Sequence, residues 1–447
     1  MGKMTFKGGA HPPEYKHLTD KLAIETLPAP ERVFVPIVQH LGAPGKPIVQ
    51  VKEEVKAGQA LTAPGGYVSA PVHSPVSGKV KKIGKYPHPF GRQVETIEIE
   101  NDGKDEPIYE FAEEADYLDL PREEMLKRIQ QGGLAGMGGA AFPTHVKLQP
   151  PAEKPIDTLI LNGAECEPYL TSDHRLMLEY GEEIFKGLEI IQKILSPKQV
   201  FIGIEDNKPD AIEHLTEVGS AYPEVKVMAL PVKYPQGAEK QLISALVKRE
   251  VPSGGLPMEV GCLVHNVGTT LAVYEAVAKR KPLLERVVTV TGDGVVNPKN
   301  IRAKIGTPFS ALIEYCGGYT DRAGKLIMGG PMMGLSQHTD EVPVIKGTSG
   351  ILVLEDRTAV LAEPKPCIGC SRCLEVCPMG LAPTLLGTYV EYNLTEKALK
   401  HDILDCMECG SCTYICPTKR NLVHLIKLGK MNALELRKKE QEKTKAA

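Results

Sequence analysis

Apolar and polar positions in the middle of the chain form blocks that predict strands and helices in alternation. Continuous apolar runs such as DTLILNG predict buried strands, and the segments between them carry apolar residues at helical spacing. In chain order we expect a helix at REEMLKRIQQ, a strand at 157–163, a helix over 173–195, a strand at 200–206, a helix over 209–218, a strand at 225–232 and a helix after residue 233. This alternation predicts a doubly wound, Rossmann-like α/β domain, with ligands at the carboxyl ends of its strands.

The two flanks of this domain have different patterns. Short β runs separated by turns fill residues 33–100, and residues 286–334 combine a strand, a glycine-rich turn, a helix over 307–316 and a second strand. We therefore expect a multidomain protein of mixed α/β and α+β class. The expected domains are a β module over 1–110, the α/β domain over 111–282, a small α+β module over 283–352, a cysteine-rich helical domain over 353–430, and a charged tail over 431–447 that is disordered or a frayed helix.

The composition argues against several classes of function. The chain has 447 residues, of which 42% are hydrophobic and 24% are charged, as in ordinary soluble proteins. A formal net charge of -3 gives no electrostatic footprint for nucleic acid. Every apolar run is shorter than the ~20 residues of a membrane-spanning helix, and the first residues lack a signal-peptide pattern. We expect a soluble chain that stays in the cytoplasm and reaches a membrane only through partner subunits.

Eight of the eleven cysteines lie in two copies of one motif. Residues 367–378 and 406–417 each read C-x2-C-x2-C-x3-C-P, the bacterial ferredoxin run that holds a cubane [4Fe–4S] cluster. Zinc sites usually pair two C-x2-C units, and disulfides are rare in a reducing compartment, so both alternatives are weaker. The other cysteines, Cys166, Cys262 and Cys316, follow no such pattern, and a small buried side chain is the simplest interpretation of Cys166.

In this motif the fourth cysteine reaches across to the other cluster. Two cubane clusters that exchange ligands lie close together and form a short path for the transfer of single electrons. The stretch between the two motifs has helical spacing and predicts a helical insert. The expected ligand sets are Cys367, Cys370, Cys373 and Cys416, which we call cluster site 1, and Cys377, Cys406, Cys409 and Cys412, which we call cluster site 2.

A glycine-rich loop, GGLAGMGGAAFPTHVKL at 132–148, is the main candidate for binding another cofactor. Dense glycines let backbone N–H groups approach a phosphate, and a following helix N-terminus adds a favourable dipole. The loop follows a predicted helix, so we expect it between helices or just before a strand. It is neither a GxGxxG after a strand nor a Walker loop, and on its own such a loop is more often a plain turn.

Four segments in a fixed order give this loop a context. GGAAFPTHVK resembles the GGAGFPTGLK loop of the flavin- and NADH-binding subunit of respiratory complex I, and NGAECEP, YPQGAEKQLI and LVHNVGTTL resemble further motifs of that subunit. The same order of motifs, together with two C-terminal clusters and the YPQGAEKQLI segment, is found in the RnfC family, whose members belong to the Rnf complexes. The resemblance spans nearly the whole chain and is closer to the RnfC family than to complex I.

The resemblance implies an FMN cradle, with NAD(H) as the substrate that carries the hydride. The implied residues are Gly136, Gly138, Gly139 and Lys147 in the cradle, with Lys147 at the FMN phosphate; Asn162, Glu165 and Glu167 near the flavin; Tyr234, Gly237 and Glu239 on the nicotinamide side; and Asn266 and Thr269 closing the flavin pocket. Without the resemblance, Asn162 and Asn266 would more simply cap helices, Lys147 would be a surface lysine, and Tyr234 would be a packing residue.

The chain also departs from the complex I pattern. Met137 stands where that loop has arginine, and Ala141 where it has glycine. Ala164 replaces an aspartate, Ala238 a glutamate and His265 an asparagine. We therefore expect nicotinamide and flavin contacts that differ from those of complex I, and a flavin that binds loosely.

Two flanking segments resemble known small folds. SAPVHSPVSGKVKKI and its neighbours resemble the barrel-sandwich fold of biotinyl and lipoyl carrier domains, but the hairpin tip APGGYVSAP lacks the carrier lysine. Residues 286–334 resemble the β-grasp soluble-ligand-binding (SLBB) module, in which Met332 and Met333 are expected to pack at a domain contact. We expect His73 and His88, in β turns, to bind no metal.

NADH gives up two electrons as a hydride whereas a cubane accepts one, and a flavin converts between the two. The resemblance implies the NADH-facing subunit of a membrane-bound, ion-translocating ferredoxin:NAD+ oxidoreductase. Such a subunit is peripheral on the cytoplasmic side of the bacterial inner membrane and contacts other subunits, one of which interacts with ferredoxin. Two alternatives remain: a soluble flavin diaphorase module of another complex, such as a hydrogenase, and a non-catalytic iron–sulfur relay whose loop binds no nucleotide.

Overall fold

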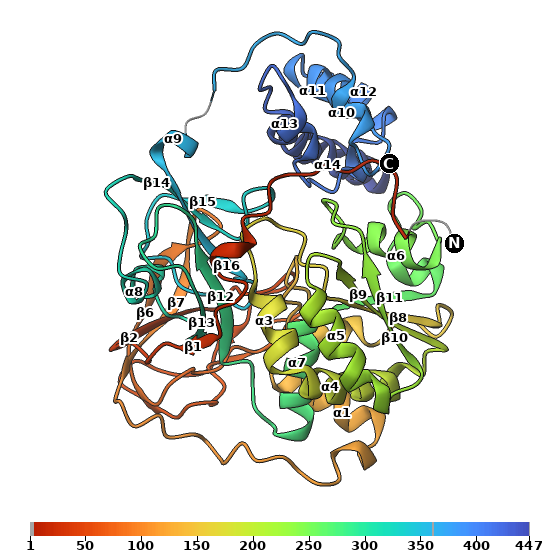
Figure 1. The fold of residues 1–447 in the computed structure, drawn as a ribbon. Helices are drawn as coiled ribbons and strands as arrows, with labels where there is room; N and C mark the ends of the chain where they lie inside the picture. Colours follow the sequence, from red (N-terminus) through yellow and green to blue (C-terminus); the bar gives the residue numbers. More distant parts are fainter. Residues whose placement is uncertain (1–3, 360–361, 447) are drawn as a thin grey trace.

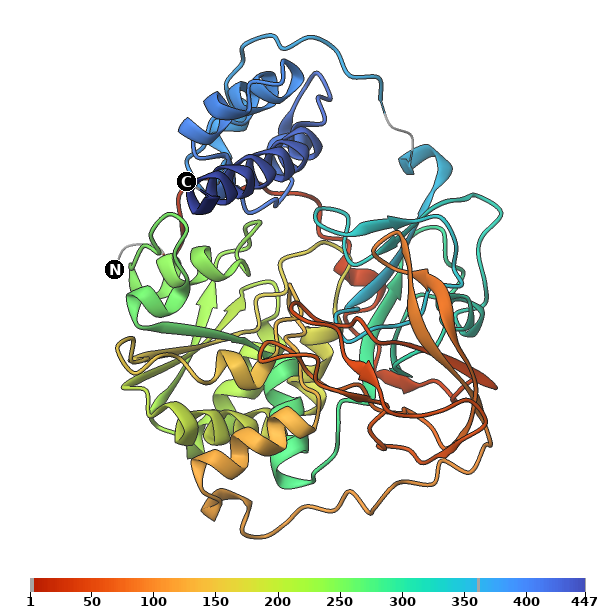
Figure 2. The same cartoon turned by 180° about the vertical axis from the view of Figure 1, so that it is seen from behind.

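The computed structural model describes residues 4–359 and 362–446 (Figure 1). A helical C-terminal domain lies at one end of the molecule, next to the α/β domain and apart from most of the two β modules. Figure 2 shows that a long extended segment leads from the β modules to the helical domain. Within the described ranges, every helix is too short or too polar to cross a membrane.

The α/β domain is built on a parallel sheet with the strand order β10-β9-β8-β11. The three predicted strands are confirmed, and β11 completes the sheet. The strands are β8 (Thr158–Asn162), β9 (Gln199–Glu205), β10 (Val225–Leu230) and β11 (Cys262–Asn266). The helices are α1 (Arg122–Gln131), α2 (Thr144–Lys147), α3 (Ser172–Glu179), α4 (Gly181–Leu195), α5 (Pro209–Val218), α6 (Glu239–Val247) and α7 (Val267–Ala278). Asn162 and Asn266 pair in register, so the carboxyl ends of β8 and β11 lie side by side.

One predicted helix is wrong. The segment 173–195 forms two helices, α3 and α4, because Tyr180 leaves the helical conformation with φ −134°. Gly181 opens α4 against α5, where an added Cβ would lie 2.7 Å from Nε2 of His214. The periodicity of the apolar residues continues through the break, which is why the pattern alone does not reveal it.

The N-terminal β module has two small antiparallel sheets, in the orders β2-β7-β6-β4 and β3-β5. Its strands are β2 (Arg32–Pro36), β3 (Lys46–Pro47), β4 (Glu54–Val55), β5 (Thr62–Ala63), β6 (Gly78–His88) and β7 (Arg92–Asn101). Alternate residues face inward, so Val33, Val35, Ile97 and Ile99 are buried in one core. The barrel-sandwich expectation is correct.

The second β module is a six-stranded mixed sheet in the order β1-β13-β12-β16-β14-β15. Its elements are β12 (Glu285–Thr291), β13 (Lys299–Lys304), α8 (Phe309–Tyr315), β14 (Ala323–Met328), β15 (Leu335–Gln337), β16 (Gly350–Glu355) and the following α9 (Asp356–Ala359). The edge strand β1 (Ile24–Thr26) comes from the N-terminal region and pairs in parallel with β13. The β-grasp expectation holds, with this addition from a distant part of the chain.

The C-terminal domain is helical. Its helices are α10 (Arg372–Glu375), α11 (Pro383–Glu391), α12 (Thr395–Lys400), α13 (Ser411–Ile415) and α14 (Leu422–Ala446). Helices α11 and α12 are the helical insert predicted between the cysteine motifs. The charged tail continues α14 as far as Ala446, so a helix rather than disorder is observed there. Short 3-10 turns occur at Lys16–Leu18, Tyr117–Asp119, Gly219–Ala221, Pro257–Val260 and Ile403–Asp405. Residues 1–3, 360–361 and 447 lie outside the described part of the chain.

The N-terminal segment ahead of β1 fastens the domains to one another. The Gly9 amide donates to the carbonyl oxygen of Val376 at 2.9 Å, in the helical domain. The buried Lys16 Nζ donates to the carbonyl oxygens of Glu165 and Leu170 at 2.8 and 2.7 Å, in the α/β domain. Because a buried ammonium needs such acceptors, this segment holds the loop after β8 in one conformation.

Candidate functional site

The four thiols of cluster site 2 stand around one pocket. The pocket is lined by Cys377, Pro378, Met379, Leu381, Pro383, Cys406, Met407, Cys409, Gly410, Ser411, Cys412, Val423 and Ile426. Burial raises the pKa of Cys412 to about 12, and the neighbouring thiols of Cys406 and Cys409 add to the shift. An apolar pocket walled by four interacting thiols fits a cubane cluster with four cysteine ligands. Across the described residues, no three His, Cys, Asp or Glu side chains converge on a position for a single metal ion.

The thiols of cluster site 1 lie nearer the surface. Cys367 and Cys370 are exposed, whereas Cys373 and Cys416 are buried. Burial raises the pKa of Cys373, and the neighbouring thiols of Cys416 and Cys367 act in the same direction. The predicted exchange of the fourth cysteine between motifs is therefore compatible with the fold, since Cys416 lies beside Cys373 of the other motif.

Cluster site 2 contacts the α/β domain. The Tyr234 hydroxyl donates to the carbonyl oxygen of Cys409 at 2.8 Å. The Gln241 amide, on α6, donates to the carbonyl oxygen of Pro378 at 3.3 Å. These two bonds join the turn after β10 and the helix after it to both cysteine motifs.

The glycine-rich loop lies between α1 and α2, one of its two predicted positions. Its ends are closed by a hydrogen bond from the Gly136 amide to the carbonyl oxygen of Phe142 at 2.9 Å. The Met137 amide donates to Oγ1 of Thr269 at 2.9 Å, which fastens the loop to α7. A Cβ on Gly138 would lie 2.9 Å from the Asn266 side chain, whereas one on Gly139 would meet open space. The loop therefore needs a glycine at 138 for close approach to α7.

The two asparagines at the ends of β8 and β11 are both engaged by the protein itself. Asn266 caps α7, because its Oδ1 accepts from the amides of Gly268 and Thr269 at 2.9 and 3.2 Å. Its Nδ2 donates to Oδ2 of Asp173 at 2.7 Å. Asn162 donates through Nδ2 to the carbonyl oxygen of Gly237 at 2.8 Å. The capping interpretation is correct for Asn266, while Asn162 joins the end of β8 to the turn before α6.

Lys147 and Glu239 form an ion pair with each other. The Lys147 Nζ lies 2.8 Å from Oε1 of Glu239, and the two side chains are 32% and 37% exposed. Sequence reasoning assigned one to the flavin phosphate and the other to the nicotinamide side. The structure brings them together at the ends of α2 and α6, so an anion approaching Lys147 competes with Glu239 for it.

The two acidic residues after β8 have different surroundings. The Glu165 carboxylate accepts from the amides of Asp173 and His174 at 2.7 and 3.1 Å and so caps α3. The Glu167 carboxylate is half-buried and accepts from the amides of Met332 and Met333 at 3.1 and 2.8 Å. Met332 and Met333 were expected to pack at a domain contact. Their backbone amides make such a contact, whereas the Met333 side chain is exposed.

The half-buried Glu167 predicts that the stability of the protein depends on pH. Burial raises the pKa of Glu167 from 4.5 to about 7, so the folded chain holds this proton more tightly than the unfolded chain. The free energy of unfolding should therefore fall by roughly 3 kcal/mol between about pH 4.5 and 7 on account of this group. Urea unfolding of the cofactor-loaded protein at pH 5 and pH 7.5 would measure it. Glu167→Gln should remove this part of the slope; parallel curves for the two proteins would contradict the assignment.

Several buried polar atoms near the cradle have no partner within the described residues. They include both ring nitrogens of His265 and His145 and both amide atoms of Gln236. Burial, together with the charge of Lys147, lowers the pKa of His265 to about 3, so this ring is neutral beside the cradle. Unpaired buried groups of this kind are costly, and a polar ligand such as FMN would satisfy them. Sequence reasoning noted His265 only as a departure and missed Gln236, although it adjoins Gly237.

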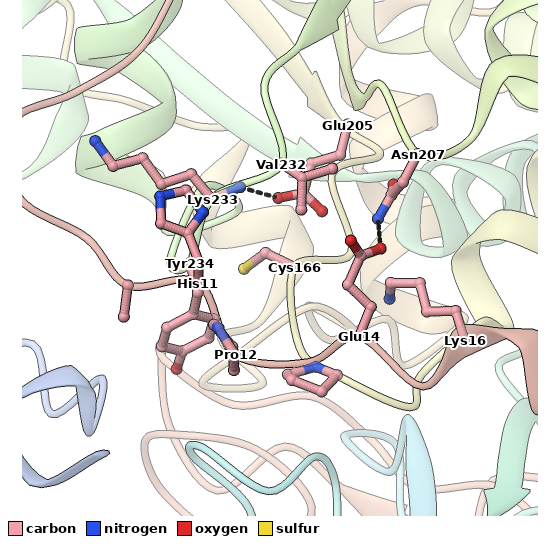
Figure 3. A pocket seen from close by; sticks show the side chains of 12 residues that line it. His11, Pro12, Glu14, Lys16, Cys166, Glu205, Asn207, Val232, Lys233 and Tyr234 are labelled. Atoms are coloured by element: carbon pink, nitrogen blue, oxygen red, sulfur yellow. Dashed lines mark hydrogen bonds between the residues drawn. The ribbon is translucent and has the colours of Figure 1, made fainter. Parts of the chain in front are cut away.

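A second cavity, of about 200 Å³, opens beside the carboxyl ends of β9 and β10 (Figure 3). Of the expected cofactor-binding residues, Tyr234 alone lines it. Two of its lining residues bond to each other, because the Lys233 amide donates to Oε1 of Glu205 at 3.2 Å. Cys166 also lines it, and its sulfur accepts from the Gly237 amide at 3.2 Å. Burial raises the pKa of Cys166, which keeps the thiol protonated at neutral pH, as expected for a side chain without redox chemistry.

The remaining histidines and cysteines considered in the sequence are buried in the protein. Nε2 of His88 lies 3.0 Å from the carbonyl oxygen of Val38, and His73 is buried. Cys262 and Cys316 are free and buried.

Four family descriptions match this chain. They are the Nuo51 FMN-binding domain over residues 129–275, the RnfC barrel sandwich hybrid domain over 4–104, the SLBB domain over 287–336 and the 4Fe-4S dicluster domain over 366–420. Together they cover all four folded parts of the molecule.

Full-length relatives are also similar. The chain is 47% identical over 424 residues to the C subunit of the proton-translocating ferredoxin:NAD(+) oxidoreductase complex of Clostridium ljungdahlii, covering 95% of this chain and 93% of that one. It is 45% identical to the C subunit of the Na(+)-translocating ferredoxin:NAD(+) oxidoreductase complex of Acetobacterium woodii, covering 97% and 98%. It is 42% identical to the C subunit of the ion-translocating oxidoreductase complex of Rhodobacter capsulatus, covering 90% and 78%.

Proposed function

The chain belongs to the RnfC family, the C subunits of the ion-translocating ferredoxin:NAD(+) oxidoreductases known as Rnf complexes, and we propose that it passes electrons between NAD(H) and the rest of such a complex. The observation that supports this best is the contact between the FMN-binding domain and cluster site 2. A loop of the first domain supplies Tyr234, which bonds to the backbone of Cys409 in the second. The FMN-binding domain and the thiol-lined pocket are thus joined by a hydrogen bond.

FMN, when bound, supplies the conversion between a two-electron hydride and the one-electron clusters. The chain's own residues would hold and orient it. The loop is open to a ligand at Gly139, where an added Cβ would meet nothing within 4 Å, while Gly138 allows the loop to approach Asn266 closely. Lys147 provides a cation for the phosphate. The unpaired side chains of His265 and Gln236 offer further hydrogen bonds. The twelve cofactor-binding residues implied by the resemblance remain our proposal for the FMN cradle, the flavin surroundings and the nicotinamide side together.

We place cluster site 2 before cluster site 1 on the path from NADH. Site 2 is bonded to the FMN-binding domain, whereas Cys367 and Cys370 of site 1 are exposed. A cluster at the surface can exchange an electron with a separate protein, and a cluster buried at a domain contact can exchange one within the chain. Each NADH would deliver two electrons, which leave one at a time through site 2 and then site 1.

The partners follow from this order. The exposed side of cluster site 1 would face another subunit of the complex, one that itself interacts with ferredoxin. The chain would lie on the cytoplasmic side of the membrane, where NADH is found, and the ion path would belong to other subunits. Co-fractionation with membranes that contain those subunits, and release without them, would distinguish this arrangement from a soluble diaphorase module.

The test of the function is an anaerobic preparation assayed for iron, sulfide and flavin and then mixed with NADH. We expect about eight irons and one FMN per chain, with flavin and cluster absorbance both bleached by NADH. Iron without flavin, and no bleaching after FMN is added back, would reject the enzyme and leave an iron–sulfur relay. The substitutions at Met137, Ala164 and Ala238 are the features that favour this relay alternative.

A further inference from the structure

The hydroxyl of Tyr234 lies where three domains meet. The side chain is 2% exposed and comes from the turn after β10. The backbone of this residue pairs with Ala10 of the N-terminal segment, in both directions, at 2.8 and 2.9 Å. Its Oη donates to the carbonyl oxygen of Cys409 at 2.8 Å, while the nearest Glu167 oxygen is 3.5 Å away. Because a hydroxyl has one proton, the shorter contact identifies Cys409 as its acceptor.

The third domain at this point is the β-grasp module, which contacts the residues around the Tyr234 hydroxyl. Glu167 accepts from the backbone amides of Met332 and Met333 in the GGPMMG turn of the β-grasp module. The carbonyl oxygen of Met332 in turn packs on Gly410, where an added Cβ would lie 2.8 Å from it. Gly410 also has φ +80°, which favours glycine. The β-grasp turn therefore packs against Gly410, and Tyr234 donates a hydrogen bond to the backbone of Cys409, the residue before it.

We propose that Tyr234 is a positioning residue for electron transfer: its hydroxyl, by bonding to the backbone of a ligand of cluster site 2, fixes that cluster against the FMN-binding domain. The inference deepens the proposed function and rests on it. In each transfer one electron passes from the flavin side to cluster site 2, and Tyr234 keeps its proton, so no bond of the hydroxyl is made or broken. The same bond partly offsets the negative end of the Cys409 carbonyl dipole beside the cluster, which favours the reduced form of that cluster.

Packing by the ring and bonding by the hydroxyl can be separated. Tyr234→Phe keeps the ring and leaves the carbonyl oxygen of Cys409 without this donor. Tyr274→Phe is the matched control. Tyr274 lies on α7 of the same domain and is 1% exposed, and its hydroxyl donates to Oε2 of Glu113 at 2.6 Å. Both variants lose one hydroxyl bond, but only the first loses a bond to a cluster ligand.

The experiment is stopped-flow reduction of the fully loaded protein by NADH, with electron paramagnetic resonance of the reduced clusters. Flavin content, the NADH-to-flavin rate and the KM for NADH are measured for Tyr234→Phe in the same samples, so that any loss of its proposed nicotinamide-side contact is separated from the flavin-to-cluster step. The flavin-to-cluster rate should fall about tenfold, and the signal and midpoint potential of one cluster should shift, the potential to a more negative value, with the other cluster unaffected. Tyr274→Phe should match wild type in all of these.

The outcomes separate this inference from the proposed function. A wild-type protein that holds no flavin overturns the function first. If wild type works and Tyr234→Phe reduces both clusters at the wild-type rate with unshifted signals, the inference is wrong. If Tyr234→Phe loses the iron of cluster site 2, the hydroxyl is needed to hold that cluster rather than to position it, and the proposal is rejected.

Discussion

Replacing Cys412 with alanine should remove the cluster at site 2 and cut the remaining cluster off from NADH. Iron should fall from about eight to about four per chain, because the other ligand set is intact. NADH should still bleach the flavin, since the cradle lies in another domain, but reduction of the remaining cluster should slow by about a hundredfold. Iron analysis and stopped-flow absorbance with NADH measure both effects.

Cys373→Ala is the matched control for this prediction. Cys373 and Cys412 are each 8% exposed, and both pack with Leu422 and Val423 in one small core. The two replacements should therefore cost the fold similar amounts. Cys373→Ala should lose the cluster at site 1 yet leave the site 2 cluster reducible by NADH, with only the delivery of electrons to an added acceptor impaired. The reverse result, with Cys373→Ala blocking NADH and Cys412→Ala permitting it, would invert the proposed order.

Replacing Lys147 with methionine should weaken FMN binding by about a hundredfold, because a hydrogen bond to a charged phosphate is among the stronger ones. The same change should cost the fold little. The ion pair with Glu239 is about one-third exposed at each end, and such pairs contribute about 0–1 kcal/mol. Titration of flavin-free protein with FMN, followed by flavin fluorescence, gives the affinity, and urea unfolding gives the stability.

Two variants control for the ion pair itself. Lys154→Met breaks a pair with Glu259 that is similarly exposed in the same domain, and it should bind FMN as wild type does. Glu239→Gln breaks the pair of Lys147 but keeps the cation, so FMN affinity should be unchanged or higher. If Glu239→Gln lost flavin as fully as Lys147→Met, the ion pair rather than the cation would matter, and the assignment of Lys147 to the phosphate would be wrong.

Local patterns in the sequence already contain the cofactor chemistry. The four-cysteine run is recognised from spacings of two and three residues, because one loop wraps one cube. The strands β8, β9 and β10 are predicted from short apolar runs buried under helices. The glycine-rich loop is likewise visible from its own composition, and the families it resembles supplied the rest of the candidate residues. Each of these signals lies within about twenty residues of chain.

The partners of the candidate side chains depended on the tertiary structure. Tyr234 meets Cys409 across 175 positions of sequence, and Lys147 meets Glu239 across 92. No local pattern marks either pair, since each forms only when separate elements pack together. Capping by Asn266 was predictable from its place before a helix, whereas the bond from Asn162 to Gly237 required the neighbouring turn.

The cofactors that the chain is built to hold can thus be inferred from its motifs, because motif spacing is a local geometric constraint that is visible without the fold. Which cluster site adjoins the FMN-binding domain, and which lies at the surface, becomes clear once the domains are assembled. That arrangement depends on how the N-terminal segment packs against the first cysteine motif, and on how the turn after β10 and the GGPMMG turn pack against the second. Such packing is set by contacts among distant residues, which no window of sequence contains.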